Sequence, residues 1–350
     1  TVGGVRGRGT LKSNLNGGTN IVDGVGNGAP AFTSGGTHTV NVLTAPGAPT
    51  IGTATAGDAQ ASVTFSAPAS NGGSAITSYT ATASPGGAFG SCAGPAACTA
   101  VVTGLTNGTS YTFTVTATNA VGTSVSSAAS NAVTPKGNQT ITFGNPGAQN
   151  FGTTPTLSAT STSGLPVTFT SSTGGVCTIT AGGALTFVTP GSCTIDADQA
   201  GNGAWNAAPT LSRSFAVNAV VPGAPTIGTA TAGDTQASVG FTAPASTGGA
   251  SITGYTATAN PGGATGTAAA APITVTGLTN GVSYTFTVTA TNSAGTGAAS
   301  AASNSVIPKA AQVITFANPG AQNYGTTPTL SATSDSGLPV TFTSSTTGVC

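Results

Sequence analysis

The clearest pattern along the chain is a strict alternation of apolar and polar residues over short runs. In the run 111–118, Tyr, Phe, Val and Ala alternate with Thr, and the run 284–291 has the same order. A period of two is typical of an antiparallel strand with one buried face, and β-branched Thr suits its solvent side. No stretch carries a convincing helical period. The pattern therefore predicts an all-β protein.

The chain also repeats itself, with a period of about two small domains. Residues 46–82 return at 222–258 with 30 of 37 positions identical, at an offset of 176. Residues 139–143 return at 312–316, at an offset of 173. The three-residue difference falls within 85–103, where the first copy is longer. The two halves of a period differ in sequence, which indicates two kinds of domain.

The first half of each period carries a distinctive motif: Leu-Thr-Asn-Gly-Thr-Ser-Tyr at 105–111, Val-Thr-Ala-Thr-Asn at 115–119 and Gly122. With these residues it resembles the fibronectin type III family. The second copy has the matching residues Leu278, Tyr284, Asn292 and Gly295. The resemblance covers about 44–135 and 220–308, and it implies a β-sandwich in each range.

The resemblance also implies roles for individual core residues. In the family, a Leu and a Tyr form the corner that locks the two sheets together, which corresponds here to Leu105 and Tyr111. The family usually carries a core Trp in an early strand. Phe65 and Phe241 stand at that place in this chain, which lowers the volume of the core without changing the expected fold.

The second half of the period, 136–219 and 309–350, has motifs of its own: Gln-Thr-Ile-Thr-Phe at 139–143, Gly-Thr-Thr-Pro at 152–155, Ser-Gly-Leu-Pro-Val-Thr-Phe at 163–169, and Cys177 with Cys193. With these residues it resembles the immunoglobulin-like repeats of long bacterial surface proteins. Alternation of such units with fibronectin type III domains is similar to large surface proteins of Gram-negative bacteria. The resemblance implies tandem β-sandwich domains, arranged as beads on a string, in a protein of the bacterial cell surface or a secreted protein.

Two of the five cysteines lie in the longer loop of the first copy. Cys92 and Cys98 have no counterparts in the second copy, which has four alanines at 268–271. Cysteines that are absent together indicate a pair, so we expect a Cys92–Cys98 disulfide that closes a hairpin tip and adds about 2 kcal/mol of stability. A metal site would need two further ligands, which are not nearby. Matched pairs of cysteines also indicate an exported protein.

Cys177 and Cys193 are expected to form the second disulfide. Residues 176–180, 184–188 and 192–198 look like three successive strands. In a plain meander the first and third strands would lie about 9–10 Å apart, which is too far for a disulfide. The bond therefore requires that one of these strands changes sheet or that the strands are arranged differently.

Residues 309–350 contain only the opening part of an immunoglobulin-like unit. Cys350 stands 173 residues after Cys177, and we expect it to be unpaired within these 350 residues. The N-terminal segment 1–43 loosely resembles the closing part of the same unit. One interpretation is a longer polypeptide. The other is a head-to-tail assembly, in which 1–43 of one copy completes 309–350 of another by strand donation.

The residue types in the sequence give little support for a catalytic, metal or cofactor site. The chain has a single histidine, His38, which we interpret as a solvent-facing strand residue; it has no Glu, and its six Asp are scattered. Asp196 and Asp198 share a strand face and could hold Ca²⁺ with loop carbonyls, but two carboxylates are more typical of a solvated polar face. Trp205 is a candidate for sugar stacking, and we favour a loop aromatic that closes its sandwich. We expect neither enzyme activity nor a cofactor.

The charge content limits the classes of partner. Charged residues are 3% of the chain and the net charge is zero. The clustered Lys and Arg that bind nucleic acid or anionic membranes are lacking. No apolar run approaches the roughly 20 residues needed to cross a bilayer. Low charge gives weak self-repulsion, which eases association between copies of the chain.

These features favour a non-catalytic extracellular structural protein, such as a surface stalk or a filament of repeated domains. Short Pro-containing linkers at 46–49, 135–136 and 308–309 limit bending between domains. Two alternatives stay open: an adhesin that binds a host molecule or glycan, and the spacer region of a secreted polysaccharide hydrolase. Exposed aromatics on one face would favour the adhesin, and a carboxylate-bearing domain elsewhere would favour the hydrolase.

Overall fold

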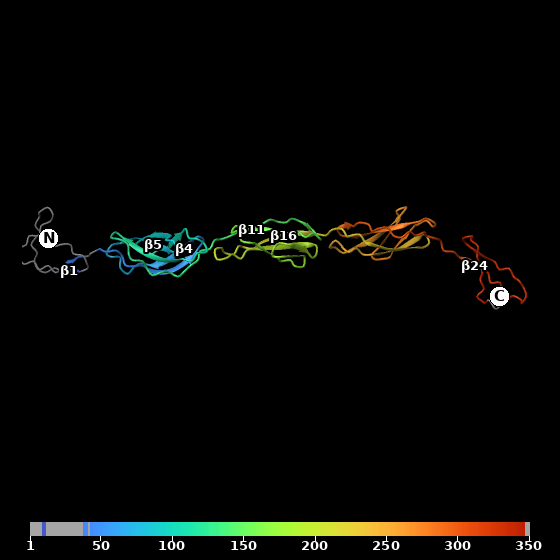
Figure 1. Cartoon of the computed structure of the whole chain (residues 1–350), viewed down its shortest axis with the longest axis horizontal. Helices are drawn as coiled ribbons and strands as arrows, with labels where there is room; N and C mark the ends of the chain where they lie inside the picture. Colours follow the sequence, from blue (N-terminus) through green and yellow to red (C-terminus); the bar gives the residue numbers. More distant parts are fainter. Residues whose placement is uncertain (1–8, 12–37, 41–42, 347–350) are drawn as a thin grey trace, which may run out of the picture. The chain divides into compact units, whose positions relative to one another are not determined.

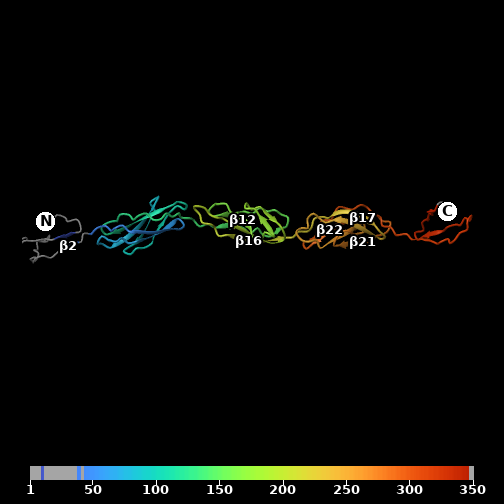
Figure 2. The ribbon, with the colours of Figure 1, turned by 90° about the horizontal axis from the view of Figure 1, so that it is seen from below.

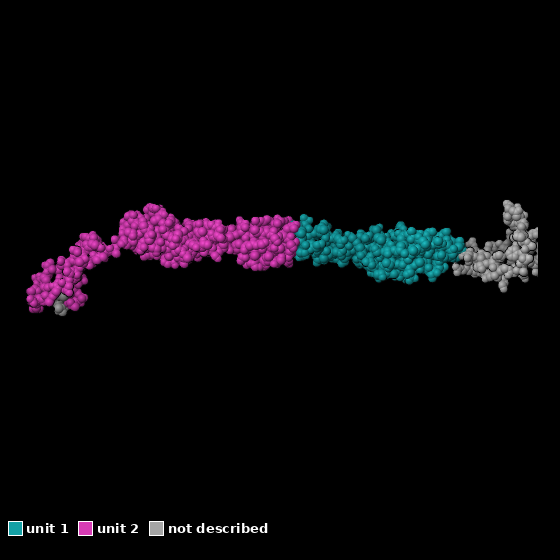
Figure 3. Space-filling view, turned by 180° about the vertical axis from the view of Figure 1, so that it is seen from behind, with its two compact units in different colours: residues 1–143, 159–168, 197–211 teal, residues 144–158, 169–196, 212–350 magenta. Residues whose placement is uncertain are grey.

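The computed structural model describes residues 9–11, 38–40 and 43–346 (Figure 1). These residues form strands and loops, which confirms the all-β fold class. No helix that is long and apolar enough to cross a bilayer lies among them. The chain divides into two compact units, coloured separately in Figure 3. Their residues are 1–143, 159–168 and 197–211 for the first, and 144–158, 169–196 and 212–350 for the second.

The first sandwich, residues 44–135, has two antiparallel sheets of three strands. In chain order its strands are β3 (Thr50–Ala56), β4 (Gln60–Ser66), β5 (Ile76–Ser84), β6 (Phe89–Ala93), β7 (Ala100–Thr103) and β8 (Thr112–Asn119). One sheet has the order β3-β4-β7 and the other the order β6-β5-β8. Every second residue of β8 is buried, as the alternation predicts. Apolar side chains from both sheets form one core.

The second sandwich, residues 220–308, repeats this arrangement (Figure 2). Its strands are β17 (Thr226–Ala232), β18 (Gln236–Thr242), β19 (Gly254–Asn260), β20 (Thr265–Ala268), β21 (Ile273–Thr276), β22 (Thr285–Asn292) and β23 (Gly295–Thr296). The sheet orders are β17-β18-β21 and β20-β19-β22-β23. Its core contains the same residue types as the core of the first sandwich at most places, with Ile273 where the first has Ala100.

The phenylalanine at the expected place of the core Trp contacts a tyrosine in each sandwich. The rings of Phe65 and Tyr79 lie 4.9 Å apart between centroids, and those of Phe241 and Tyr255 lie 4.6 Å apart. Both pairs are tilted, within the range of favourable aromatic contacts. All four residues are buried. In each sandwich, the Phe at the expected place of the core Trp thus packs against a Tyr of the opposite sheet.

The expected tyrosine corner is present in both sandwiches. The hydroxyl of Tyr111 accepts a hydrogen bond from the backbone N–H of Thr106 at 3.0 Å, and Tyr284 accepts one from Thr279 at 3.1 Å. Leu105 is buried beside this turn. A buried phenol needs a polar partner, and the turn before the strand supplies it. The corner therefore fixes the loop between β7 and β8 against the core.

Serines spaced three residues apart complete the free edge of β8. The hydroxyl of Ser127 accepts a hydrogen bond from the backbone N–H of Val115 at 2.9 Å, and the N–H of Ser127 donates to the carbonyl of Val115 at 2.9 Å. Ser124 and Ser130 make the same pair of bonds to Ala117 and Phe113. These serines satisfy backbone groups that a strand without a regular neighbour would leave unpaired.

The middle segment, residues 136–219, has short strands. They are β9 (Ile141–Phe143), β10 (Gln149–Asn150), β11 (Ala159–Ser161), β12 (Thr168–Ser171), β13 (Cys177–Ile179), β14 (Leu185–Phe187), β15 (Gly191–Asp198) and β16 (Leu211–Asn218). Strand β9 pairs with β11, and β13 pairs with β14. The remaining four form one sheet, in the order β10-β16-β15-β12.

Two short strand pairs lie outside these domains. Strands β1 (Gly9–Leu11) and β2 (His38–Val40) are antiparallel, as are β24 (Ile314–Phe316) and β25 (Ala332–Ser334). Most of 1–43 lies outside the described residues. Cys350 does so too, and the expectation that Cys350 is unpaired stays a prediction.

The serine edge gives a direct test of its contribution to stability. We expect Ser127→Ala to destabilise the first sandwich by about 1–3 kcal/mol, because it leaves the buried N–H of Val115 without its acceptor. Hydrogen exchange of the β8 amides, measured by NMR across a urea series, would report this change for the first sandwich alone.

The neighbouring Ser126 is exposed and serves as the matched control. Ser126→Ala should leave the β8 amides unchanged. Equal effects of the two substitutions would contradict the role given to the Ser127 hydroxyl.

Candidate functional site

The carboxylates of Asp196 and Asp198, which were considered as Ca²⁺ ligands, accept hydrogen bonds from nearby hydroxyl groups. Asp196 accepts hydrogen bonds from the hydroxyls of Ser172, at 2.9 Å, and of Ser212. Asp198 accepts one from the hydroxyl of Thr210. No group of three or more His, Cys, Asp or Glu side chains that could hold a metal occurs among the described residues. The side chain of His38 lies outside what the structure describes.

Trp205 packs against the linker that leaves the first sandwich. The N–H of Gly137 donates to the carbonyl of Ala204 at 2.9 Å, and the N–H of Asn206 donates to the carbonyl of Gly137 at 2.8 Å. A Cβ at Gly137 would come within 2.7 Å of the indole ring of Trp205. The position of the indole ring therefore requires glycine at residue 137. The Trp205 side chain is half-buried.

A hydrogen-bonded cluster surrounds the same linker. The carboxylate of Asp58 accepts from the side-chain amide of Asn107 at 2.8 Å and from the backbone N–H of Asn138 at 3.3 Å. These two bonds, the one from Asn107 first, hold the pKa of Asp58 below its ordinary value. Asn138 also accepts from the side-chain amide of Asn206 at 3.0 Å. No local sequence pattern predicts this cluster.

In the second sandwich the matching cluster is smaller. Asp234 accepts from the side-chain amide of Asn280 at 2.8 Å. Ala311 stands where the first copy has Asn138, and within the described residues its N–H makes no hydrogen bond to Asp234. The two junctions therefore differ in polar contacts although the sandwiches are alike.

Both ends of the first sandwich are tied to its own loops. On entry, the N–H of Thr44 donates to the carbonyl of Gly72 at 2.9 Å. The buried amide of Asn119 donates to the carbonyl of Thr44 at 2.8 Å. On exit, the N–H of Gly108 donates to the carbonyl of Pro135 at 2.9 Å. The second sandwich repeats these bonds with Val220, Gly248, Asn292, Gly281 and Pro308.

The Cys92–Cys98 disulfide is formed, with 6.4 Å between the Cα atoms. Its location differs from the predicted hairpin tip. Strands β6 and β7 belong to opposite sheets, so the bond closes a loop that crosses from one sheet to the other. Within this loop the carbonyl of Pro95 accepts a hydrogen bond from the hydroxyl of Tyr79 at 3.0 Å. The longer loop thus gives a buried phenol its partner, and burial raises the pKa of Tyr79.

The Cys177–Cys193 disulfide is also formed, with 5.7 Å between the Cα atoms. Cys177 lies in β13, which pairs with β14, whereas Cys193 lies in β15 of the four-stranded sheet. The third strand has therefore changed sheet, which is one of the two arrangements that the sequence argument required. Both sulfur atoms are buried in the middle segment.

Comparison with known proteins identifies the two sandwiches. A family model described as fibronectin type III domain matches residues 45–133 and 223–306. No curated protein matches the chain. Among solved structures, the chicken CNTN1 FN1–FN3 domains are 19% identical over 76% of this chain and 99% of that one, with a TM-score of 0.26. Titin domains A168–A170 are 15% identical over 75% and 98%, with a TM-score of 0.28.

A shorter match involves titin kinase and its flanking domains, which are 30% identical over 26% of this chain and 18% of that one, with a TM-score of 0.24. The family match coincides with the two segments in which Tyr111 and Tyr284 form the corner. Residues 45–133 and 223–306 are therefore fibronectin type III domains.

Proposed function

We propose that this chain is a non-catalytic, extracellular spacer, which forms part of a stalk or filament of a bacterial surface or secreted protein. The observation that carries the proposal is the attachment of both ends of each sandwich to its own loops. A pull on the linkers reaches the sheets through several backbone hydrogen bonds, so each domain resists extension as a unit.

Two further features support the proposal. Disulfides persist in oxidising compartments, and this chain has two of them. Its polar surface consists largely of Thr, Ser and Asn, while charged residues are only 3% of the sequence. Such a surface gives little electrostatic attraction for charged ligands. The middle segment is assigned to the immunoglobulin-like class as part of the same proposal.

Single-molecule extension of the whole chain tests the spacer role. We expect separate unfolding events for the first sandwich, the middle segment and the second sandwich. Reduction of the disulfides should lengthen the middle-segment step by about 50 Å, because 16 more residues extend at roughly 3.5 Å each from an initial Cα separation of 5.7 Å. The first sandwich should gain about 15 Å by the same reasoning, for a separation of six residues.

The second sandwich has no cysteine, so its step is the internal control and should not change on reduction. A featureless extension curve, without stepwise unfolding, would rule out a mechanical role for these domains.

The junction cluster leads to a second expectation. Asp58→Ala should accelerate hydrogen exchange at the N–H of Asn138, because it removes the acceptor of that bond. Acid should have the same effect. Folding lowers the pKa of Asp58, so its carboxylate stabilises the folded state fully when the pH is above the unfolded pKa. This stabilisation is lost as the pH falls through the folded pKa, which lies below about 3.8.

Asp234→Ala is the matched control. It removes the bond from Asn280 in the second sandwich and should leave the exchange at Asn138 unchanged. NMR measurements of amide exchange between pH 2 and pH 6 would show both effects. An Asn138 amide that exchanges equally fast in both variants would contradict the assignment.

A further inference from the structure

The two disulfides of the chain differ in their exposure to solvent. Cys177 and Cys193 lie in strands β13 and β15, and both side chains are 0% exposed. Cys92 and Cys98 are only half-buried against the core of the first sandwich. A thiol must reach a sulfur atom before it can react with a disulfide. The Cys92–Cys98 bond is therefore open to such an attack, and the Cys177–Cys193 bond is shielded from it.

The two cysteines of the exposed bond lie on different kinds of backbone. The residues that flank Cys98, 95–97 and 99, are exposed and belong to no strand. Cys92 lies in β6 and pairs with Tyr79 of β5. The side chain of Cys98 can thus turn towards solvent without loss of strand pairing, whereas a movement of Cys92 would break its pairing.

The second sandwich shows that the fold does not require this bond. Ala268 stands at the place of Cys92, since it pairs with Tyr255 of β19 as Cys92 pairs with Tyr79 of β5. The second sandwich has no cysteine, yet its six corresponding strands pair in the same order. Breaking the Cys92–Cys98 bond should therefore leave the first sandwich folded.

Two hydrogen bonds hold the loop independently of the sulfur atoms. The N–H of Gly94 donates to the carbonyl of Thr77 at 2.8 Å, and the hydroxyl of Tyr79 donates to the carbonyl of Pro95 at 3.0 Å. A Cβ at residue 94 would come within 2.3 Å of the carbonyl oxygen of Ile76, so the loop is seated closely on β5 at this place. These contacts hold the first half of the loop in place after the disulfide is broken.

The surroundings of the exposed bond are neutral. Asp58 is the only charged residue within 44–135, and its carboxylate belongs to the cluster with Asn107 and Asn138. An attacking thiolate is an anion, so a carboxylate beside the bond would repel it. Because no such charge is present, the rate of reaction depends on access to the sulfur atom and on the incoming thiolate itself.

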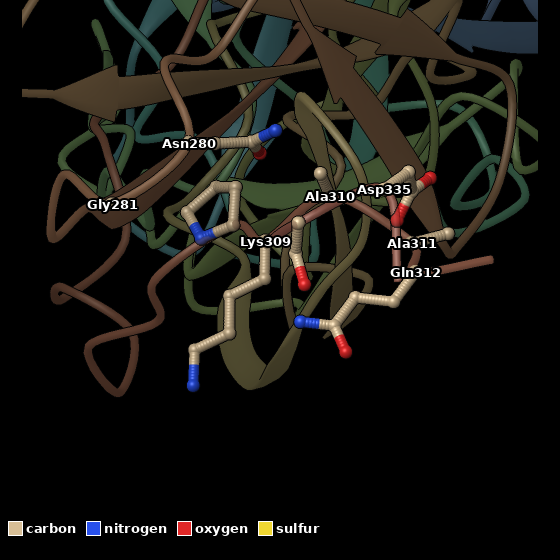
Figure 4. A pocket seen from close by; sticks show the side chains of 9 residues that line it. Asn280, Gly281, Lys309, Ala310, Ala311, Gln312 and Asp335 are labelled. Carbon is tan, nitrogen blue, oxygen red and sulfur yellow. The ribbon is translucent and has the colours of Figure 1, made fainter. Parts of the chain in front are cut away.

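The pocket beside the second sandwich offers no comparable chemistry. Its polar side chains include Asn280, Lys309, Gln312 and Asp335 (Figure 4). Amide, ammonium and carboxylate groups form no covalent bond with a thiol, whereas a disulfide does. Covalent capture of a thiol is therefore a property of the disulfide loop and not of this pocket.

We propose that the Cys92–Cys98 disulfide is a thiol-exchange site, at which a thiol-bearing ligand becomes bonded to Cys98. The thiolate of the ligand attacks Sγ of Cys98 and forms a new S–S bond. The bond to Sγ of Cys92 breaks, and Cys92 leaves as a thiolate that takes a proton from water. One disulfide is exchanged for another, so the step needs no further oxidant. This inference does not depend on the proposed spacer role.

Peptide mapping by mass spectrometry tests the exchange on the full chain. The chain carries Cys350→Ala, which removes the one cysteine outside the two disulfides. It is incubated with graded concentrations of reduced glutathione, and free thiols are then blocked with N-ethylmaleimide. We expect glutathione on Cys98 and the blocking group on Cys92. The buried pair, Cys177 and Cys193, should react only at concentrations at least about tenfold higher.

Two single substitutions test which sulfur atom accepts the ligand. Cys92→Ala leaves Cys98 as a free thiol, and Cys98→Ala leaves Cys92 as a free thiol. With oxidised glutathione, the first variant should form its mixed disulfide at least about tenfold faster, because Cys98 lies outside the strand pairing. Equal rates, or a faster reaction at Cys92, would contradict the assignment to Cys98.

Hydrogen exchange of the same samples shows whether the sandwich stays folded. The amides of Phe113 and Val115 in β8 should keep their protection after the exchange. They should also keep it in the double variant Cys92→Ala/Cys98→Ala, which reproduces the alanines of the second sandwich. Loss of this protection would show that the fold needs the bond and would overturn the proposal. Reaction of both disulfides at the same glutathione concentration would overturn it too.

A second probe distinguishes the sources of the thiol. A small folded protein with one surface cysteine replaces glutathione in the same incubation. Its bonding to Cys98 would assign the site to protein partners, and bonding of glutathione alone would assign it to small thiols. The absence of a mixed disulfide with either probe would refute the exchange site.

Discussion

A sheet with one apolar face is stable only when a second layer covers that face, and this constraint governs every part of the described chain. In the first sandwich, Phe65 and Tyr79 come from opposite sheets and meet in the core. The middle segment moves β15 into another sheet, and a disulfide joins the two sheets at that place. Where the cover is incomplete, as at Phe342, apolar side chains remain exposed.

Neutral polar side chains take the structural role that charged side chains have in many proteins. With only 3% charged residues, the chain satisfies its irregular backbone through serine and asparagine. Ser127 completes the edge of β8, and Asn131 makes two bonds to the backbone of Ala54, at 2.9 Å and 3.0 Å. Asn119 holds the entering linker. Bonds between neutral groups do not titrate and are little screened by salt, so these contacts depend little on pH and ionic strength.

Features set by short-range patterns could be predicted from the sequence, and features set by three-dimensional pairing could not. The alternation in 111–118 identified β8 and its buried face. The spacing of Cys177 and Cys193 required either that a strand changes sheet or that the strands are arranged differently, and the structure has the first arrangement. The prediction that the disulfide at Cys92 closes a hairpin tip was wrong, because a local loop sequence does not specify which sheet the next strand joins. The serine edge at Ser127 was missed because its period of three differs from both the helical and the strand period.

The contacts at the junction that follows the first sandwich could not be predicted for a further reason. The fit of Trp205 to Gly137 depends on residues that are far apart in sequence, so no local pattern records it. A methyl group at position 137 would collide with the indole ring of Trp205, so this junction is specified by the size of one residue rather than by charge.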